Sequence, residues 1–545
     1  MNGVMFQGFH YFLDKTFPES NGRNLWEFLK DEAAYLSRSG IYAVWIPPPY
    51  KAEGKNSVGY DVYDHFDLGE FNIKGRPQIA TKYGDKTQLL EAITALHNAG
   101  IQVYADVVLN HKSGGEADGE FWEAIRVEPE NRAYERWGNG FEEGKIDIRA
   151  YTIFQNSTRG DKYSAFKWRV KHFDSVDTVV EIRQNGNSFP KDSRGYIYRY
   201  LCNEPGYDPP CKNFERWVSL EKGNYDYLTS SDIDFGRYDV REEMKYWGEW
   251  LVKELNLDGV RLDAVKHISG NYVREWLGHV RAKTQKKLFA VAEYIASETK
   301  YLHEYISIMS APDSFPQTIT LFDFPLRFKF REASWKGELF DLRELNYGIL
   351  MVEQPTMAVT FVENHDYEYG RQVDSHVKEW FKPLGYAFIL LRQAGYPCVF
   401  FPDLYGSVTT GDHQGQPSGK NYLELLLKLR QQFALGEERY SAEANVAGWV
   451  RVGFVPRAKG AMVTVINNSF NKVKAINVNT GRTNKQFYHL ATIKWTPGGF
   501  LVVNNRYEQY GDKAQELWTD AEGWGNFPAD GGSVSIWLEE GTQLD

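Results

Sequence analysis

The chain has 545 residues, of which 42% are hydrophobic and 25% charged, a composition typical of folded globular proteins and unlike that of collagen-like, disordered or coiled-coil proteins. Its length allows about three domains, or one large barrel with additions. Lysine and arginine number 63 against 73 aspartates and glutamates, and the resulting net charge of −10 argues against nucleic acid as a main partner.

Short apolar runs, each typical of a buried strand, alternate along the chain with segments of helical periodicity. The helical segments include 24–40, 85–100 and 240–257. Repeated strand–helix units predict a parallel sheet, and eight of them indicate a (β/α)8 barrel, with a doubly wound open sheet as the lesser alternative. The eight runs are 4–9, 42–47, 101–108, 258–263, 288–293, 318–324, 358–363 and 397–401.

The repeat is interrupted after the third strand by about 120 residues, many more than one crossover helix needs. This stretch is rich in Gly, Asn, Asp, Tyr and Trp, and we expect it to form an inserted domain of irregular β structure. After a helix-like segment at 421–436, alternating strand patterns predict a separate C-terminal antiparallel β-sandwich. The expected domains are 1–110 and 236–436 for the barrel, 111–235 for the insertion, and 437–545 for the sandwich.

Polar residues end four of the apolar runs, at the position where the reactive groups of such barrels gather. The runs are DVVLNH (106–111), GVRLDAVKH (259–267), AVAEY (290–294) and FVENHD (361–366). A single acidic residue after a strand is most often a helix cap or a solvated charge. Four such strand ends are difficult to explain by capping alone.

These strand ends provide the carboxylates that a retaining glycosidase needs, one ionised and attacking carbon, the other carrying a proton for the leaving oxygen. Asp263 lies two positions from Arg261, hence on the same strand face, and is the candidate nucleophile. Glu293 has a less polar local sequence and is the candidate general acid/base. Asp366 could grip sugar hydroxyls and help distort the ring.

Two histidines, His111 and His365, lie at the ends of the first and fourth of these runs. Each could donate a hydrogen bond to the same sugar ring from opposite sides. A structural role at a strand end is the alternative for both.

At these residues the sequence resembles the α-amylase family, glycoside hydrolase family 13, and most closely its liquefying bacterial-type members and their intracellular relatives. The resemblance runs from QGFHYF through AVWIPPPYK, VGYDVYD and the four runs above to VFFPDLYG, and covers most of residues 4–435. It implies that Asp263 is the nucleophile, Glu293 the acid/base and Asp366 the transition-state stabiliser. It also implies sugar contacts from Tyr60, His111, Arg261, Lys266, His267 and His365.

The resemblance further implies a structural Ca²⁺ site that joins the insertion to the barrel, because Ca²⁺ takes several oxygen ligands. Its ligands would be Asn110, Asp226, Asp232 and the backbone carbonyl of His267. Some members carry a second Ca²⁺ or Na⁺ cluster. For that cluster Asp174 and Asp234 match, whereas Glu215 stands where Asp is usual and Gly236 where another carboxylate is expected, which leaves a second metal open.

The leading hypothesis is therefore a retaining, endo-acting hydrolase of α-1,4-glucans such as starch, glycogen or maltodextrin. A transglycosylase shares the same covalent intermediate and is the nearest alternative. A catalytically inactive glucan-binding protein is the alternative from another class. A metal-dependent aldolase or isomerase is disfavoured, because neither a phosphate-binding glycine-rich loop nor a catalytic metal triad is visible.

Several features bear on the cellular setting. Apolar stretches fall far short of the roughly 18 residues that span a bilayer, so no membrane partner is expected. The N-terminus lacks the basic region and apolar core of a signal peptide, which indicates a cytoplasmic protein or, alternatively, the mature form of a secreted one. Cys202 and Cys211 could pair in an oxidising setting or remain two free thiols. A monomer is expected.

Overall fold

The computed structural model describes the chain except for a set of short segments, given at the end of this paragraph. Cys202 and Cys211 lie outside the described residues, so their predicted pairing remains a prediction. The residues not described are 1, 15, 74–76, 131, 133–144, 186, 190–194, 202–213, 216, 312–315, 372–374, 410–414, 454–459, 505–515 and 545.

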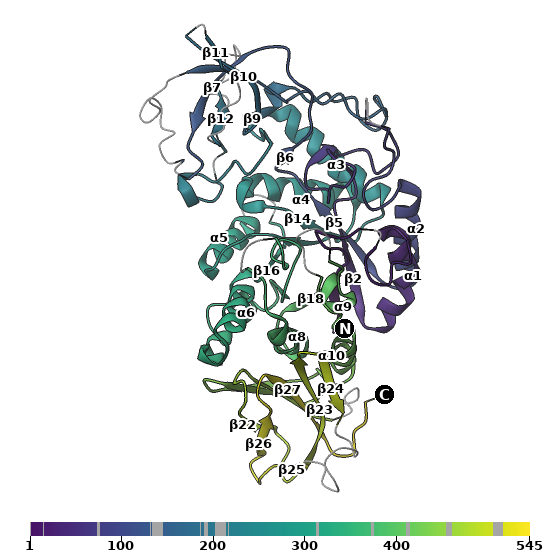
Figure 1. Cartoon of the computed structure of the whole chain (residues 1–545), viewed down its shortest axis with the longest axis vertical. Coiled ribbons are helices and arrows are strands. Elements are labelled where there is room, and N and C mark those ends of the chain that lie inside the picture. Colours follow the sequence, from purple (N-terminus) through teal and green to yellow (C-terminus); the bar gives the residue numbers. More distant parts are fainter. Residues whose placement is uncertain are drawn as a thin grey trace.

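A closed barrel of eight parallel strands forms the centre of the molecule (Figure 1). Neighbours around it follow the order β1-β18-β17-β16-β15-β14-β5-β2. This confirms the (β/α)8 barrel and rules out the open sheet, and each of the eight strands falls within a predicted run or within one residue of it. The strands are β1 (Val4–Gln7), β2 (Ile41–Ile46), β5 (Gln102–Val107), β14 (Gly259–Leu262), β15 (Phe289–Ala292), β16 (Thr320–Phe322), β17 (Ala358–Phe361) and β18 (Tyr396–Phe400).

Helices surround the barrel and begin where the sequence provides caps. Asn24 accepts a hydrogen bond from the backbone of Glu27, and Asp85 does the same for Gln88, so both helices start with a capping box. The helices are α1 (Leu25–Arg38), α2 (Lys86–Asn98), α3 (Tyr238–Glu254), α4 (Gly270–Thr284), α5 (Thr299–Ser310), α6 (Phe324–Lys336), α7 (Leu350–Glu353), α8 (Lys382–Leu391), α9 (Phe401–Tyr405) and α10 (Lys420–Gln432).

An eight-stranded sheet lies between β5 and α3 in chain order, with the strand order β11-β10-β8-β7-β12-β9-β13-β6. The sequence predicts β structure here, and the sheet is more continuous than the irregular arrangement expected. Its β6 edge begins directly after the barrel strand β5, where His111 pairs with Asp232 of β13. The strands are β6 (His111–Lys112), β7 (Trp122–Val127), β8 (Ile146–Ala150), β9 (Phe173–Val176), β10 (Val179–Gln184), β11 (Asn187–Phe189), β12 (Ile197–Tyr200) and β13 (Ser231–Ile233).

The C-terminal strands are antiparallel, as predicted, and lie at the opposite end of the barrel from the eight-stranded sheet (Figure 1). Val463 of one sheet and Phe527 of the other belong to one buried cluster, so the two sheets share a core. The strands are β19 (Glu438–Ala442), β20 (Val446–Arg451), β21 (Met462–Asn467), β22 (Lys474–Asn479), β23 (Gln486–Thr496), β24 (Gly499–Asn504), β25 (Glu516–Trp518), β26 (Trp524–Ala529) and β27 (Ser533–Glu539). Among the described residues, none of the helices combines the length and apolar character that a membrane span requires.

Candidate active site and metal centre

Arg261 stands at the centre of a cluster of carboxylates at the carboxyl ends of the barrel strands. Its Nη1 donates to Asp106 at 2.9 Å and to Asp263 at 2.5 Å, and its Nη2 lies 2.9 Å from Oε2 of Glu293. The strand register explains this meeting. Arg261 of β14 is paired with Asp106 of β5, Asp263 directly follows β14, and Glu293 directly follows the neighbouring β15.

Asp263 and Glu293 differ in how their oxygens are held. Burial raises the pKa of Asp263 to about 7 and that of Glu293 to about 8, although the Arg261 guanidinium lowers both. Oε2 of Glu293 accepts a hydrogen bond from the backbone of Ala264 at 3.1 Å, whereas its buried Oε1 has no hydrogen-bond partner among the described residues. Oε1 can therefore present a proton, while Asp263 is fixed by its short bond to a cation.

Tyr60 and His365 form an aromatic wall beside the carboxylates. Their rings are parallel within 3°, with centroids 5.0 Å apart, and the Tyr60 hydroxyl donates to Asp106 at 2.8 Å. His111 donates from Nε2 to the backbone oxygen of Tyr60 at 2.9 Å. Burial lowers the pKa of both His111 and His365 to about 4, so both rings are neutral at pH 7 and act as hydrogen-bonding groups rather than charges.

One cavity of about 400 Å³ collects the predicted site residues. Only Arg261 of the predicted catalytic and sugar-contact set is absent from its lining, because it is buried beneath the carboxylates that it holds. Residues that follow four barrel strands, together with Tyr60 from a loop, thus face a single space. The predicted residues that line it are Tyr60, His111, Asp263, Lys266, His267, Glu293, His365 and Asp366.

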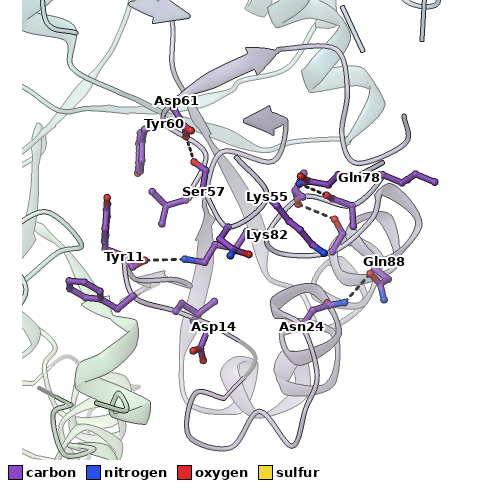
Figure 2. A pocket seen from close by; sticks show the side chains of 18 of the residues that line it. Tyr11, Asp14, Asn24, Lys55, Ser57, Tyr60, Asp61, Gln78, Lys82 and Gln88 are labelled. Atoms are coloured by element: carbon purple, nitrogen blue, oxygen red, sulfur yellow. Dashed lines mark hydrogen bonds between the residues drawn. The ribbon is translucent and has the colours of Figure 1, made fainter. Parts of the chain in front are cut away.

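A second, larger cavity of about 1330 Å³ adjoins the first, and both are lined by Tyr60 and Asp366. Figure 2 shows side chains that surround it, including Tyr11 and Lys82, whose Nζ donates to the Tyr11 backbone oxygen at 3.2 Å. Its volume exceeds that of a site for one small molecule. The space suits a chain of several sugar units that reaches the carboxylates at one end.

Lys266 and His267 connect the cavity to the loop before β13. Nζ of Lys266 donates to Glu221 and to the backbone oxygen of Ile295, each at 2.9 Å. Nδ1 of His267 donates to the backbone oxygen of Tyr225 at 2.6 Å, and burial lowers the pKa of His267 to about 3. His267 is therefore neutral and lies directly beside the residue that precedes Asp226.

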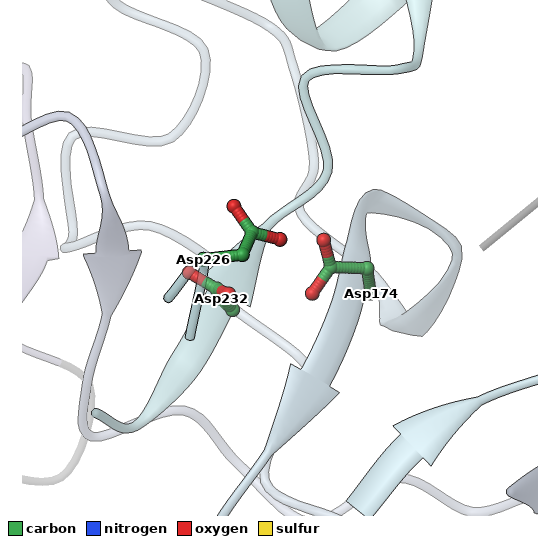
Figure 3. A group of neighbouring side chains, drawn as sticks. All are labelled: Asp174, Asp226 and Asp232. Carbon is green, nitrogen blue, oxygen red and sulfur yellow. The ribbon is translucent and has the colours of Figure 1, made fainter. Parts of the chain in front are cut away.

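Three buried carboxylates form a candidate metal centre next to this loop: one ligand oxygen from each of Asp174, Asp226 and Asp232 lies within 4.8 Å of the others (Figure 3). Asn110 donates its amide to Asp232 at 3.0 Å, and its buried Oδ1 has no hydrogen-bond partner among the described residues. Burial and mutual repulsion raise the pKa values of Asp226 and Asp232 well above the ordinary range. Hard oxygen ligands crowded in this way fit a cation such as Ca²⁺.

The three residues that the sequence assigned to a second metal do not form one group in the structure. Asp174 joins the first group, whereas Glu215 and Asp234 lie outside this group of three. Oε2 of Glu215 accepts from the backbone of Ser269 at 2.8 Å, and burial beside Asp174 and Asp234 raises the pKa of Glu215 to about 8. Asp234 accepts from the backbone of Gly236 at 2.9 Å.

Asp106 is the functional-site residue that the sequence reasoning missed. It accepts hydrogen bonds from Trp45 at 3.0 Å, from Tyr60 and from Arg261, and it is completely buried. A charged residue inside the apolar run 101–108 was the available signal, because a buried charge is retained only with a partner. Its partner on β14 could not be deduced without the strand register.

A closed parallel barrel that brings Asp263 and Glu293 to one arginine beside two adjoining cavities is the arrangement of a barrel glycoside hydrolase. Residues 12–174 match the family described as the α-amylase catalytic domain. The chain is 40% identical to an α-amylase of Geobacillus stearothermophilus over 100% of this chain and 88% of that protein. It is 38% identical to the cytoplasmic α-amylase of Escherichia coli over 99% of both chains. The chain therefore belongs to the α-amylase family of glycoside hydrolases.

The solved structures agree in fold. The acarbose complex of an α-amylase from Geobacillus thermoleovorans aligns with a TM-score of 0.59, covering 99% of this chain and 98% of that one at 14% identity. At this identity the alignment supports the architecture alone.

Proposed function

We propose that this protein hydrolyses internal α-1,4-glucosidic bonds of starch, glycogen or maltodextrins with retention of anomeric configuration. The observation that carries the proposal is the Arg261 guanidinium, which contacts both Asp263 and Glu293 at the wall of one cavity. A retaining glycosidase needs an attacking carboxylate and a protonated carboxyl group on either side of the scissile bond. The amylase names of relatives 38–40% identical over nearly the whole chain support this substrate class.

In the first step Glu293 transfers its proton to the glycosidic oxygen while a carboxylate oxygen of Asp263 attacks the anomeric carbon. The bond between that carbon and the leaving oxygen breaks, and the glucosyl unit becomes an ester of Asp263. In the second step ionised Glu293 removes a proton from water, which attacks the same carbon and releases Asp263. Asp366 stabilises the positive charge that develops on the sugar ring in both steps.

The adjoining cavity of about 1330 Å³ supports internal cleavage, because several glucose units can lie between its far end and Asp366. Tyr60, His111, Lys266, His267 and His365 supply polar and aromatic contacts to the reacting glucose. His111 and His365 do so as neutral groups.

We assign the structural cation to Ca²⁺, held by Asn110, Asp226, Asp232 and the His267 carbonyl, with Asp174 as a further ligand. When bound, the ion neutralises carboxylates that otherwise repel one another. Because Asp174 lies in β9 and Asn110 follows barrel strand β5, these side chains tie the eight-stranded sheet to the barrel.

The test is a time course of products from maltoheptaose with the anomeric configuration recorded by NMR. Hydrolysis with retention gives only shorter sugars, released first as the α-anomer. Products longer than the substrate would favour the transglycosylase alternative. Starch binding without release of reducing ends, unchanged in Asp263→Asn, would favour an inactive binding protein.

A further inference from the structure

The loop that follows β17 contacts the loop that follows β1 through hydrogen bonds and a cation–π contact next to the larger cavity. Glu368 accepts from the backbone of Tyr11 at 2.7 Å and contacts Nδ1 of His10 at 3.0 Å, and the latter pair is buried. Arg371 lies over the Tyr11 ring, with its Cζ 3.4 Å from the ring centroid. The two loops therefore hold the Arg371 guanidinium in a defined place.

That place is beside Asp366. One guanidinium nitrogen of Arg371 lies 3.8 Å from Oδ1 of Asp366, and Nε2 of His365 lies 3.4 Å from Oδ2. Gln7 donates to Nδ1 of His365 at 3.0 Å, so the proton of this neutral ring is on Nε2 and points to Asp366. Asp366 is thus placed between one neutral donor and one cation.

The positive charge of Arg371 matters because the other charged side chains near Asp366 carry or share negative charge. Asp263 and Glu293 both experience the negative charge of Asp366, and Arg261 is engaged by Asp106, Asp263 and Glu293. Among the described residues, Arg371 supplies the only ion pair between Asp366 and a permanently charged side chain.

We infer that Arg371 is a positioning residue for the reaction: held by the Tyr11 ring, its guanidinium keeps the Asp366 carboxylate directed at the reacting glucose. This inference rests on the proposed role of Asp366 in hydrolysis. Arg371 also lines the larger cavity together with Tyr11 and Asp366, so sugar units bound in that cavity lie against its guanidinium. Its loss therefore affects both turnover and binding.

The experiment compares wild type with Arg371→Gln and Arg371→Lys on maltoheptaose, measuring kcat, KM and the pH dependence of kcat/KM. Arg343→Gln is the matched control, because Arg343 is exposed and pairs with Asp341 away from both cavities. Thermal unfolding of each variant reports whether the fold is retained.

We expect Arg371→Gln to lower kcat by about 10- to 100-fold, the size of effect seen when a partner that orients a functional side chain is lost. Removing a cation also raises the pKa of nearby carboxyl groups, so the acidic limb of the profile moves to higher pH by on the order of half a unit. Arg371→Lys keeps the charge, which holds the limb near its wild-type position. It restores kcat only in part, because an ammonium cannot stack on Tyr11 as a planar guanidinium does.

A fully folded Arg371→Gln variant with kcat within about twofold of wild type and unmoved pH limbs would overturn the inference. So would a variant whose only change is a lower melting temperature, since that is the result of a purely structural contact. Inactive wild-type protein would instead overturn the proposed function, and the two failures are distinguished by the wild-type measurement alone.

Discussion

Replacing Glu293 by glutamine removes the proton donor while preserving the size of the side chain. The amide oxygen can still accept from the backbone of Ala264, and Arg261 keeps its bonds to Asp106 and Asp263. Because burial raises the pKa of Glu293 to about 8, this side chain is mostly neutral at pH 7, as glutamine is. We therefore expect the fold to survive the substitution.

We expect Glu293→Gln to lose most of its turnover. A positioned general acid contributes about 10²- to 10⁴-fold to rate, which corresponds to about 3 to 5 kcal/mol of transition-state stabilisation. Glu293→Gln should lose rate in this range on maltoheptaose, measured as reducing ends released per enzyme. Oε1 of Glu293 has no hydrogen-bond partner among the described residues, so the loss comes from a missing proton rather than from a broken network.

A substrate with a good leaving group distinguishes loss of the proton donor from disruption of the hydrogen-bond network. An aryl maltooligoside whose phenol leaves without protonation should lose much less rate than maltoheptaose in Glu293→Gln. Equal losses on both substrates, or more than a tenth of wild-type activity on maltoheptaose, would refute the assignment of Glu293 as the acid. Glu344→Gln, at an exposed position far from the cavity, serves as the matched control.

Three further outcomes are expected. Asp263→Asn should abolish turnover by about 10³-fold or more, because the amide cannot form the covalent ester; mass spectrometry with a slow fluoro-sugar substrate should label wild type only. The kcat/KM profile should be bell-shaped, since activity needs Asp263 ionised and is lost as pH falls below about 7, and needs Glu293 protonated and is lost as pH rises above about 8. Chelation of the metal ion should lower the melting temperature. The free energy of unfolding should fall by about 4 kcal/mol if the free ion had exceeded its Kd by about 1000-fold. In calorimetry, Asp232→Asn should abolish this response to chelation.

The barrel was predictable because its strands are short, mostly apolar runs separated by segments with helical periodicity. The chain shows the same physical signal at each of the eight strands, and caps such as Asn24 and Asp85 mark helix starts. The sheet between β5 and α3 was harder to predict. Buried and exposed positions do not alternate regularly along its strand β10. A strand of this kind lacks the period of two by which strands are recognised in a sequence.

The site was predictable to the extent that its residues end barrel strands. Asp263, Glu293 and Asp366 each follow an apolar run, and barrel geometry alone requires such positions to converge. Asp174 was different, because its place beside Asp232 depends on the pairing of β9 with β13, which no local pattern specifies. Arg371 was also beyond sequence reasoning, since its partner Tyr11 is at the other end of the barrel sequence.

Asp106, the site residue missed from the sequence, shares the Arg261 guanidinium with both proposed catalytic acids. One guanidinium faces Asp106, Asp263 and Glu293, so a single positive charge cannot compensate three buried negative ones. Burial raises the pKa of Asp106 to about 6. This pKa is lower than those of Asp263 and Glu293, because Trp45, Tyr60 and Arg261 all donate hydrogen bonds to Asp106. Asp106 is therefore ionised first and occupies part of the positive charge. Burial, and after it the negative charges of Asp263 and Asp366, raise the pKa of Glu293 and keep its proton near neutral pH. The negative charge of Asp106 adds to burial in raising the pKa of Asp263, so a residue that does not line the catalytic cavity influences the pH at which the nucleophile ionises.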